Sequence, residues 1–314
     1  MPEFRALLIL NPVSGRQDYD STKGSILERL AEKRVPYEIR ETEGEGDAMK
    51  WAEEARGFSV VIVGGGDGTV MEVMTGMTRN PEPVPVAQLP LGTANLLARA
   101  LAIPRDLEEA IDLALDRGFV IRMDVGYLPE HERYFALVAG SGWDAQLIED
   151  ADREMKNRLG FFAYVFTGIR NLFRLRDSRI TLTVDEKVHR FRAHTIEVIN
   201  IGEIYGTGIA LGRDMSPHDG RLDIAIASSE SVFDIFKILF RIILRRFDHD
   251  ANLRYFTASN VTVEADPPLH LQADGEPIGE TPYRIEVVPN GVNLVVPQRY
   301  IEAKKLESEA LRSR

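Results

Sequence analysis

The chain has 314 residues, a net charge of −11 and no cysteine. Its length suffices for two domains with hydrophobic cores, and the lack of cysteine excludes disulfides, thiolate catalysis and cysteine-ligated zinc. The acidic balance argues against nonspecific nucleic-acid binding and against broad adhesion to anionic lipid, so any membrane contact must be local.

Residues 1–5 lead directly into an apolar strand predicted over 6–10. They lack the charged and then apolar segment of a signal peptide, and no run reaches the roughly 18 apolar residues of a membrane-spanning helix. We therefore expect a cytoplasmic protein, and the absence of cysteine is compatible with a reducing cytosol.

The first predicted strand ends in a polar loop, Asn11-Pro12-Val13-Ser14-Gly15, in which Asn11 and Ser14 can form hydrogen bonds. An amphipathic helix near 20–33 and a strand over 35–39 follow. Thr42, just beyond that strand, is a candidate nucleotide contact, although a loop threonine without a role is nearly as good an interpretation.

After a helix over 47–56, the β-branched strand 58–63 runs into Gly64-Gly65-Gly66-Asp67-Gly68-Thr69. Glycines let backbone N–H groups approach a ligand, and the helix predicted over 69–79 would present an amino terminus that favours anions. Asp67 would repel phosphates unless Mg²⁺ or a transferable proton lies between them. This loop therefore indicates phosphoryl transfer more than passive binding.

The strand 85–89 ends in a similar way, with Gly92, with Thr93 at an expected helix N-cap, and with Asn95. Helices near 94–102 and 106–116 and a strand over 119–127 complete an alternating pattern. That pattern predicts a Rossmann-like α/β domain over 1–127 whose parallel strands bring the three loops together. Because no lysine lies in the glycine loop, a metal is the expected source of charge neutralisation.

From Tyr134 onward the chain has short, turn-bordered apolar runs that favour an antiparallel β-sandwich over 128–298, followed by a charged tail over 299–314. The runs are 135–138, 180–184, 193–199, 222–227, 261–264, 269–272, 283–288 and 292–296. Two apolar helices, 159–174 and 231–247, interrupt them. Lys237, Arg241 and Arg245 form a cationic stripe on the second helix, which is typical either of a membrane-interface helix or of a core helix with one basic wet face.

The chain contains three motifs in succession, Asn11–Gly15, Gly65–Thr69 and Pro90–Asn95. In their order and spacing they resemble the successive motifs of the diacylglycerol kinase and sphingosine kinase catalytic family, whose bacterial members phosphorylate lipid hydroxyls with ATP. The resemblance extends over nearly the whole chain, through Tyr205–Gly208, Ser216–Asp223 and Asp274–Glu276. The glycine motif alone is shared with NAD kinases. One departure is Leu96, where the family often has Asp.

The resemblance implies ATP and Mg²⁺ as cofactors. The expected nucleotide-binding residues are Asn11, Pro12, Ser14, Gly15, Thr42, Gly64, Gly65, Gly66, Asp67, Gly68, Thr69, Gly92, Thr93 and Asn95. It also implies that Ser216, Asp219 and the carbonyl of Arg221 organise the metal, and that Glu276, at a turn, is the general base. Asp67 is the rival base, although we prefer a metal- and phosphate-organising role for it.

The leading functional prediction is an ATP- and Mg²⁺-dependent lipid kinase acting on diacylglycerol or a sphingoid base, peripheral to the inner face of the membrane. One alternative is a kinase of a soluble acceptor such as NAD, and another is a non-catalytic nucleotide sensor. Retention of Asp67, Asp219 and Glu276 together argues against a sensor. No nucleic-acid partner is expected, and the sequence leaves open whether the protein forms a homodimer.

Overall fold

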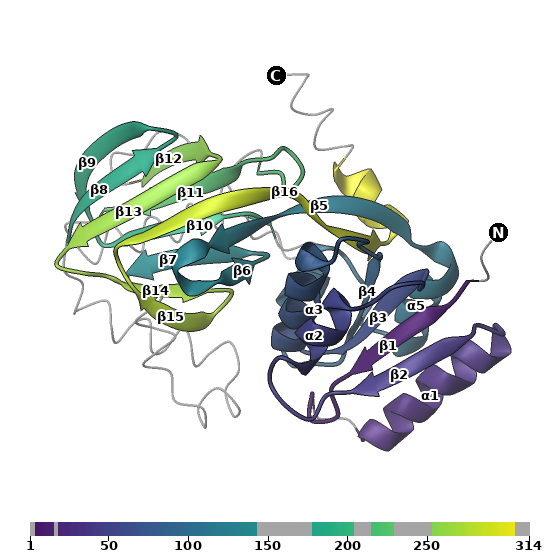
Figure 1. Cartoon of the computed structure of the whole chain (residues 1–314). Coiled ribbons are helices and arrows are strands. Elements are labelled where there is room, and N and C mark those ends of the chain that lie inside the picture. Colours follow the sequence, from purple (N-terminus) through teal and green to yellow (C-terminus); the bar gives the residue numbers. More distant parts are fainter. Residues whose placement is uncertain (1–3, 16–17, 143–177, 204–214, 229–252, 305–314) are drawn as a thin grey trace. The chain divides into compact units, whose positions relative to one another are not determined.

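The computed structural model describes residues 4–15, 18–142, 178–203, 215–228 and 253–304 (Figure 1). Internal packing divides the chain into two units. The amino-terminal unit comprises Met1–Met123, Ile204–Gly206 and Asn290–Arg314, and the second unit comprises Asp124–Glu203 and Thr207–Pro289. The helices and the parallel strands with which the chain begins belong to the first unit.

The amino-terminal unit is built on a parallel sheet with the order β2 (Tyr37–Glu41), β1 (Ala6–Leu10), β3 (Val60–Gly65) and β4 (Val86–Pro90). The carboxyl-terminal part of β16 (Tyr283–Val296) adds to β4 in parallel. Every residue of β1 and β3 is buried, as expected for central strands of a sheet that is covered on both faces.

The helices of this unit include α1 (Tyr19–Glu32), α2 (Asp47–Glu53), α3 (Asp67–Arg79), α4 (Leu96–Ala100) and α5 (Leu107–Asp112), which continues into a π-helical turn, Leu113–Arg117. Residues 298–304 are also helical. The side chains of Asp18 and Asp106 cap α1 and α5 by accepting backbone N–H bonds. Helices α2 and α3 pack together, as do α1 and α5.

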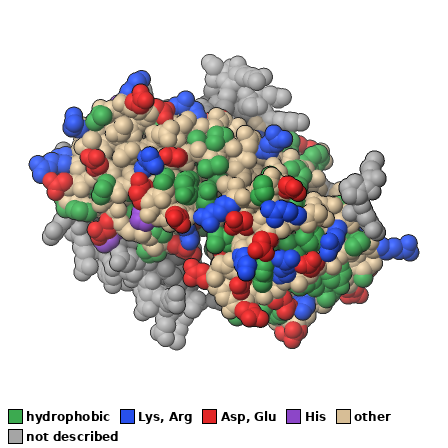
Figure 2. Space-filling model, viewed as in Figure 1, with side chains coloured by type: hydrophobic (Ala, Val, Ile, Leu, Met, Phe, Trp, Pro, Cys, Tyr) green, Lys and Arg blue, Asp and Glu red, His purple; other side chains and the backbone are tan. Residues whose placement is uncertain are grey.

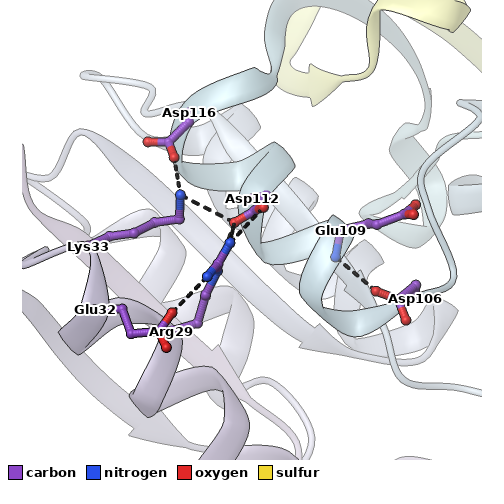
Figure 3. Close-up of polar contacts among 7 residues, drawn as sticks. All are labelled: Arg29, Glu32, Lys33, Asp106, Glu109, Asp112 and Asp116. Carbon is purple, nitrogen blue, oxygen red and sulfur yellow. Dashed lines mark hydrogen bonds and ion pairs between the residues drawn. The ribbon is translucent and has the colours of Figure 1, made fainter.

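An ion-pair cluster links α1 to α5 (Figure 3). Arg29 donates to both carboxylate oxygens of Asp112, at 2.9 Å each, and Lys33 pairs with Asp112 at 3.3 Å and with Asp116. Burial of the Asp112 carboxyl opposes ionisation, but hydrogen bonds from Arg29 and Lys33 outweigh it and lower the pKa of Asp112. The cluster thus holds a charged carboxylate between the two helices.

The second unit contains two antiparallel sheets. One has the order of the amino-terminal part of β16, β13 (Asn260–Asp266), β8 (Ser178–Val184) and β9 (Lys187–Ala193). The other has the order β12 (Leu253–Ala258), β11 (Leu222–Ala227), β10 (Thr195–Ile199), β7 (Val138–Gly142), β14 (His270–Ala273) and β15 (Glu276–Glu280).

Alternate residues of these strands enter one core, which contains Leu182 of β8, Ile224 of β11 and Val263 of β13. A shared core between two sheets with alternating burial is the arrangement of a β-sandwich. The predicted fold class, a parallel α/β domain followed by a mainly antiparallel β-sandwich, is therefore confirmed. Strands β5 (Phe119–Leu128) and β16 each begin in one unit and end in the other.

Several predicted elements are wrong in detail. The single strand over 135–138 is two strands, β6 (Arg133–Phe135) and β7, because residues 136–137 turn their N–H groups toward Asp274. The runs 283–288 and 292–296 are one strand, β16, although Pro289, Asn290 and Gly291 suggest a turn. The run 193–199 contains the end of β9 and all of β10, and β9, β12 and β15 were missed.

Both predicted apolar helices, 159–174 and 231–247, and the motif Tyr205–Gly208 lie outside the described residues. Within the described ranges, no helix has the length and apolar character needed to cross a membrane. On the face shown in Figure 2, acidic and basic side chains are intermixed over each unit. Surface ion pairs such as Arg5 with Glu38 belong to this pattern.

Candidate active site

Three loops meet at the carboxyl ends of β1, β3 and β4, where parallel α/β sheets bind ligands. The end of β3 is bonded to both of the neighbouring loops. Asn11 N–H donates to the Gly64 carbonyl at 2.9 Å, and Gly92 N–H donates to the Gly65 carbonyl at 3.2 Å. The structure therefore brings together the three predicted phosphate-facing loops.

Asn11 and Ser14 connect the first loop to the glycine loop through their side chains. The Asn11 amide donates to Thr69 Oγ1 at 2.8 Å and accepts from Val13 N–H at 3.0 Å. The Ser14 hydroxyl oxygen accepts from Gly66 N–H at 3.1 Å. Both side chains thus fix the shape of the loops in addition to any contact with a ligand.

Glycine is required where these loops approach each other. A Cβ atom on Gly92 would lie 2.5 Å from the Gly66 Cα and 2.8 Å from Asn95 Oδ1. Gly15 has φ +84°, and a Cβ there would clash with the Leu91 carbonyl oxygen. The loops therefore present backbone rather than side chains to their surroundings at these points.

Asn95 closes the third loop. Its backbone is left-handed at φ 47° and ψ 53°, and its amide nitrogen donates to the carbonyls of Pro90, at 3.0 Å, and Gly92, at 2.7 Å. Asn95 is the N-cap residue of α4, so the prediction that Thr93 occupies the N-cap is wrong; Thr93 lies in the exposed part of the preceding turn. Asn95 Oδ1 is buried without a hydrogen-bond partner among the described residues.

Asp67 lies at the start of α3, two residues earlier than the helix was predicted to begin. Its Oδ1 accepts from Leu97 N–H at 3.4 Å. Burial raises the pKa of the Asp67 carboxyl, while the backbone N–H groups of Leu97, Leu96 and Asn95 and the charge of Arg99 oppose that rise. Leu96 thus takes part in this contact through its backbone, at the position where the family often has a carboxylate.

Thr42 follows β2, and its N–H donates to the Leu10 carbonyl at 2.9 Å, which places it beside the end of β1. The preceding residue, Glu41, accepts hydrogen bonds from the Tyr19 hydroxyl and from Lys23, the latter at 2.7 Å. This cluster at the same edge of the sheet was not predicted, because its members lie far apart in the sequence.

In the second unit, the turn that contains Ser216 and Asp219 is held by Asp124. Asp124 N–H donates to the Pro217 carbonyl at 2.8 Å, and its carboxylate accepts from Gly220 N–H at 2.7 Å. Asp219 Oδ1 accepts from Arg221 N–H at 3.0 Å. Sequence reasoning missed Asp124, although a lone carboxylate within the apolar strand 119–127 was a usable signal.

The predicted metal set of Ser216, Asp219 and the Arg221 carbonyl stays a prediction. Asp219 is exposed, and Arg221 directs its guanidinium to the Thr257 carbonyl, at 2.7 Å, and toward Asp185. Over the ranges that the structure describes, no group of three or more His, Asp or Glu side chains is arranged to hold a metal.

Glu276 is the first residue of β15, and its exposed carboxylate pairs with Arg133. Its predicted place at a hairpin turn is confirmed, since Asp274 and Gly275, both with positive φ, form the turn and Glu276 pairs with Ala273 across it. Burial raises the pKa of Asp274 to about 6. Hydrogen bonds from the backbone N–H groups of residues 136–138 and the charge of Arg133 lower this pKa, but burial has the larger effect.

The raised pKa of Asp274 predicts how this carboxyl group changes the stability of the fold with pH. Between about pH 4 and pH 6 the unfolded chain ionises this carboxyl while the folded chain keeps it protonated, so this group makes the fold less stable as the pH rises through that window. A ¹³C NMR titration of the aspartate carboxyl groups, with Asp274→Asn to assign the resonance, should give a midpoint about pH 6. A midpoint about pH 4 would contradict it.

Comparison with known proteins agrees with the sequence motifs. Residues 5–128 match the family model of the diacylglycerol kinase catalytic domain, and residues 137–296 match that of the YegS C-terminal NAD kinase beta sandwich-like domain. The resemblance drawn from the three loop motifs is thereby confirmed.

Two curated relatives and a solved structure align over nearly their full length. The "Diacylglycerol kinase" of Bacillus subtilis (strain 168) is 28% identical, covering 95% of this chain and 98% of its own. The "Probable lipid kinase YegS-like" of Serratia proteamaculans (strain 568) is 29% identical, covering 94% and 95%. The crystal structure of "a putative diacylglycerol kinase from Bacillus anthracis str. Sterne" has a TM-score of 0.78 at 26% identity, covering 94% and 98%.

Proposed function

Because the chain belongs to the diacylglycerol kinase catalytic-domain family, with a YegS-type carboxyl-terminal domain, we propose that it is an ATP- and Mg²⁺-dependent lipid kinase. The acceptor is a hydroxyl of diacylglycerol or of a related lipid such as a sphingoid base. The observation that carries the proposal is the meeting of three glycine-containing loops around one half-buried carboxylate, Asp67, at the carboxyl edge of the parallel sheet.

The nucleotide phosphates would bind to backbone N–H groups of these loops. Helix α3 begins at Asp67 with Gly66 as its N-cap, so no side chain of the cap residue accepts the first N–H groups of the helix and those donors can serve an anion. Asn11 and Ser14 hold the loops in shape, and Asp67 organises the phosphates and the metal. The family resemblance supports this assignment for the predicted residues within the three loop motifs, whereas Thr42 and Gly64 lie outside those motifs and are proposed from their places at strand ends.

The predicted metal residues fit Mg²⁺ in their chemistry, since a hydroxyl, a carboxylate and a carbonyl are hard oxygen ligands and Mg²⁺ keeps several waters. Asp219 has one carboxylate oxygen without a partner in the described part of the chain, and Asp124 fixes the turn that carries it. When bound, the ion would neutralise charge on the phosphates. Ser216, Asp219 and the Arg221 carbonyl would hold it.

Glu276 would accept the proton of the lipid hydroxyl as the phosphoryl group is transferred. Its exposure leaves the carboxylate accessible to an acceptor, and the ion pair with Arg133 holds it in one place. Because the acceptor is a membrane lipid, we place the protein at the inner face of the membrane as a peripheral enzyme.

Incubation with labelled ATP and Mg²⁺ in mixed micelles, with diacylglycerol, sphingosine and NAD offered separately, tests the proposal. We expect chromatography to show label in a lipid product. Label in NAD instead would indicate a kinase of a soluble acceptor, and ATP binding without transfer to any acceptor would indicate a nucleotide sensor. Either result would overturn the lipid kinase proposal.

Asp67→Asn should lower turnover by about a hundredfold or more, because the amide keeps the shape of the loop and removes the charge that organises metal and phosphates. The far-UV circular dichroism spectrum and the thermal midpoint should stay close to those of the parent. Turnover within about threefold of the parent at saturating Mg²⁺ would remove Asp67 from the mechanism.

A further inference from the structure

Asp274 belongs to the motif that carries Glu276 and has no part in the proposed transfer of the phosphoryl group. It follows β14, takes a left-handed backbone with φ 47°, and begins the turn to β15. Gly275 N–H donates to Gln272 Oε1 at 2.9 Å, which closes the turn from the other side.

The Asp274 carboxylate is bound by three consecutive backbone N–H groups in the segment between β6 and β7. Ala136 donates to Oδ2 at 2.7 Å, and Leu137 and Val138 donate to Oδ1 at 2.9 and 3.0 Å. The Asp274 N–H also donates to the Val138 carbonyl at 2.8 Å. Successive N–H groups of this kind form a concave site for an anion, and a side-chain carboxylate of the same chain fills it.

The segment that binds Asp274 is itself held in place by Asn200. The Asn200 amide donates to the Ala136 carbonyl at 2.8 Å, and its backbone N–H donates to the Leu137 carbonyl at 2.8 Å. Asn200 is 1% exposed, so these bonds are shielded from water. The N–H groups that receive Asp274 therefore point in fixed directions.

A second link joins the same two parts of the chain. Arg133, in β6 immediately before the anion-binding segment, forms the ion pair with Glu276, two residues after Asp274. The turn before β15 is thus tied to residues 133–138 on both sides of Gly275: by the Asp274 carboxylate and by the Glu276 carboxylate. The orientation of Glu276 depends on both links.

We propose that Asp274, together with Arg133, is a positioning residue that fixes Glu276 in the orientation required of the general base. The inference rests on the proposed function, because it gives Glu276 that role. An asparagine side chain in place of Asp274 could offer one acceptor oxygen to three N–H donors and would turn an NH₂ group toward the others, so the substitution weakens the link with little change in volume.

The test is a set of rates in the same assay, with labelled ATP, Mg²⁺ and diacylglycerol in mixed micelles. Asp274→Asn should lower kcat by about tenfold or more with the KM for ATP changed by less than about threefold. In the Glu276→Gln background, the same substitution should have little further effect, because the group that it positions is already gone.

Arg133 gives a second arm that does not depend on whether the turn tolerates the Asp274→Asn substitution. Arg133→Gln should lower kcat, Arg133→Lys should restore part of it, and Arg133→Gln should have little effect in the Glu276→Gln background. Arg179→Gln, which breaks the exposed ion pair with Asp266 in the same unit, is the matched control and should behave as the parent.

Parent-like kcat in Asp274→Asn and Arg133→Gln, or full additivity of either substitution with Glu276→Gln, would overturn the inference. If Asp274→Asn fails to fold, the Arg133 series decides between the same two outcomes. Failure of the proposed function gives a different result, since the parent protein would then transfer no label to a lipid.

Discussion

The central constraint in the amino-terminal unit is the approach of the β3 loop to the β4 loop. Gly92 lies so near Gly66 that a Cβ atom on Gly92 would be 2.5 Å from the Gly66 Cα, and the loops that follow β1 and β4 are both bonded to the end of β3. This contact fixes the direction of α3, since Gly66 is its N-cap, and brings the carboxylate of Asp67 to the start of α4. This close approach explains why the motifs are rich in glycine.

In the second unit, aspartate side chains hold the turns of the candidate site in place, whereas in the first unit glycines let the loops pack closely. Asp124 and Asp274 each accept backbone N–H bonds, and each secures a turn that carries a predicted functional residue, Asp219 or Glu276. A carboxylate can bind several N–H groups of a turn at once, whereas a neutral side chain has fewer acceptor sites. The carboxylates of Asp219 and Glu276, two predicted site residues, are therefore exposed at turns that hydrogen bonds to Asp124 and Asp274 hold in place.

The sequence predicted the parallel unit well because its strands are continuous apolar runs and its loops carry glycine at strand ends. It predicted the sandwich less completely. Strand β9, Lys187–Ala193, is an edge strand with exposed basic residues, so it has little apolar signal. Pro289 and Asn290 suggest a turn, and Asn290 does take a left-handed backbone with φ 53°, yet β16 continues past them because it pairs with β13 before this point and with β4 after it.

Some residues of the candidate site could likewise be predicted from the sequence, and others could not. Asn11, Asp67 and Asn95 could be named because each lies in a motif next to a strand end. Arg133 and Asn200 could not, because their roles depend on partners between 63 and 143 residues away in the sequence, and Asp124 gave only the signal of a lone carboxylate in an apolar strand. Asp274 was visible as part of a motif, but its bonds to residues 136–138 required the structure.

Equilibrium binding of ATP to the Gly92→Ala variant tests most directly the central claim that the packed backbone of the three loops forms the nucleotide site. The control is Gly24→Ala, since Gly24 lies in α1 with open space around an added Cβ. We predict that Gly92→Ala weakens ATP binding by about tenfold or more while unfolding stays cooperative, and that Gly24→Ala binds as the parent does. Parent-like affinity in a folded Gly92→Ala variant would contradict the account.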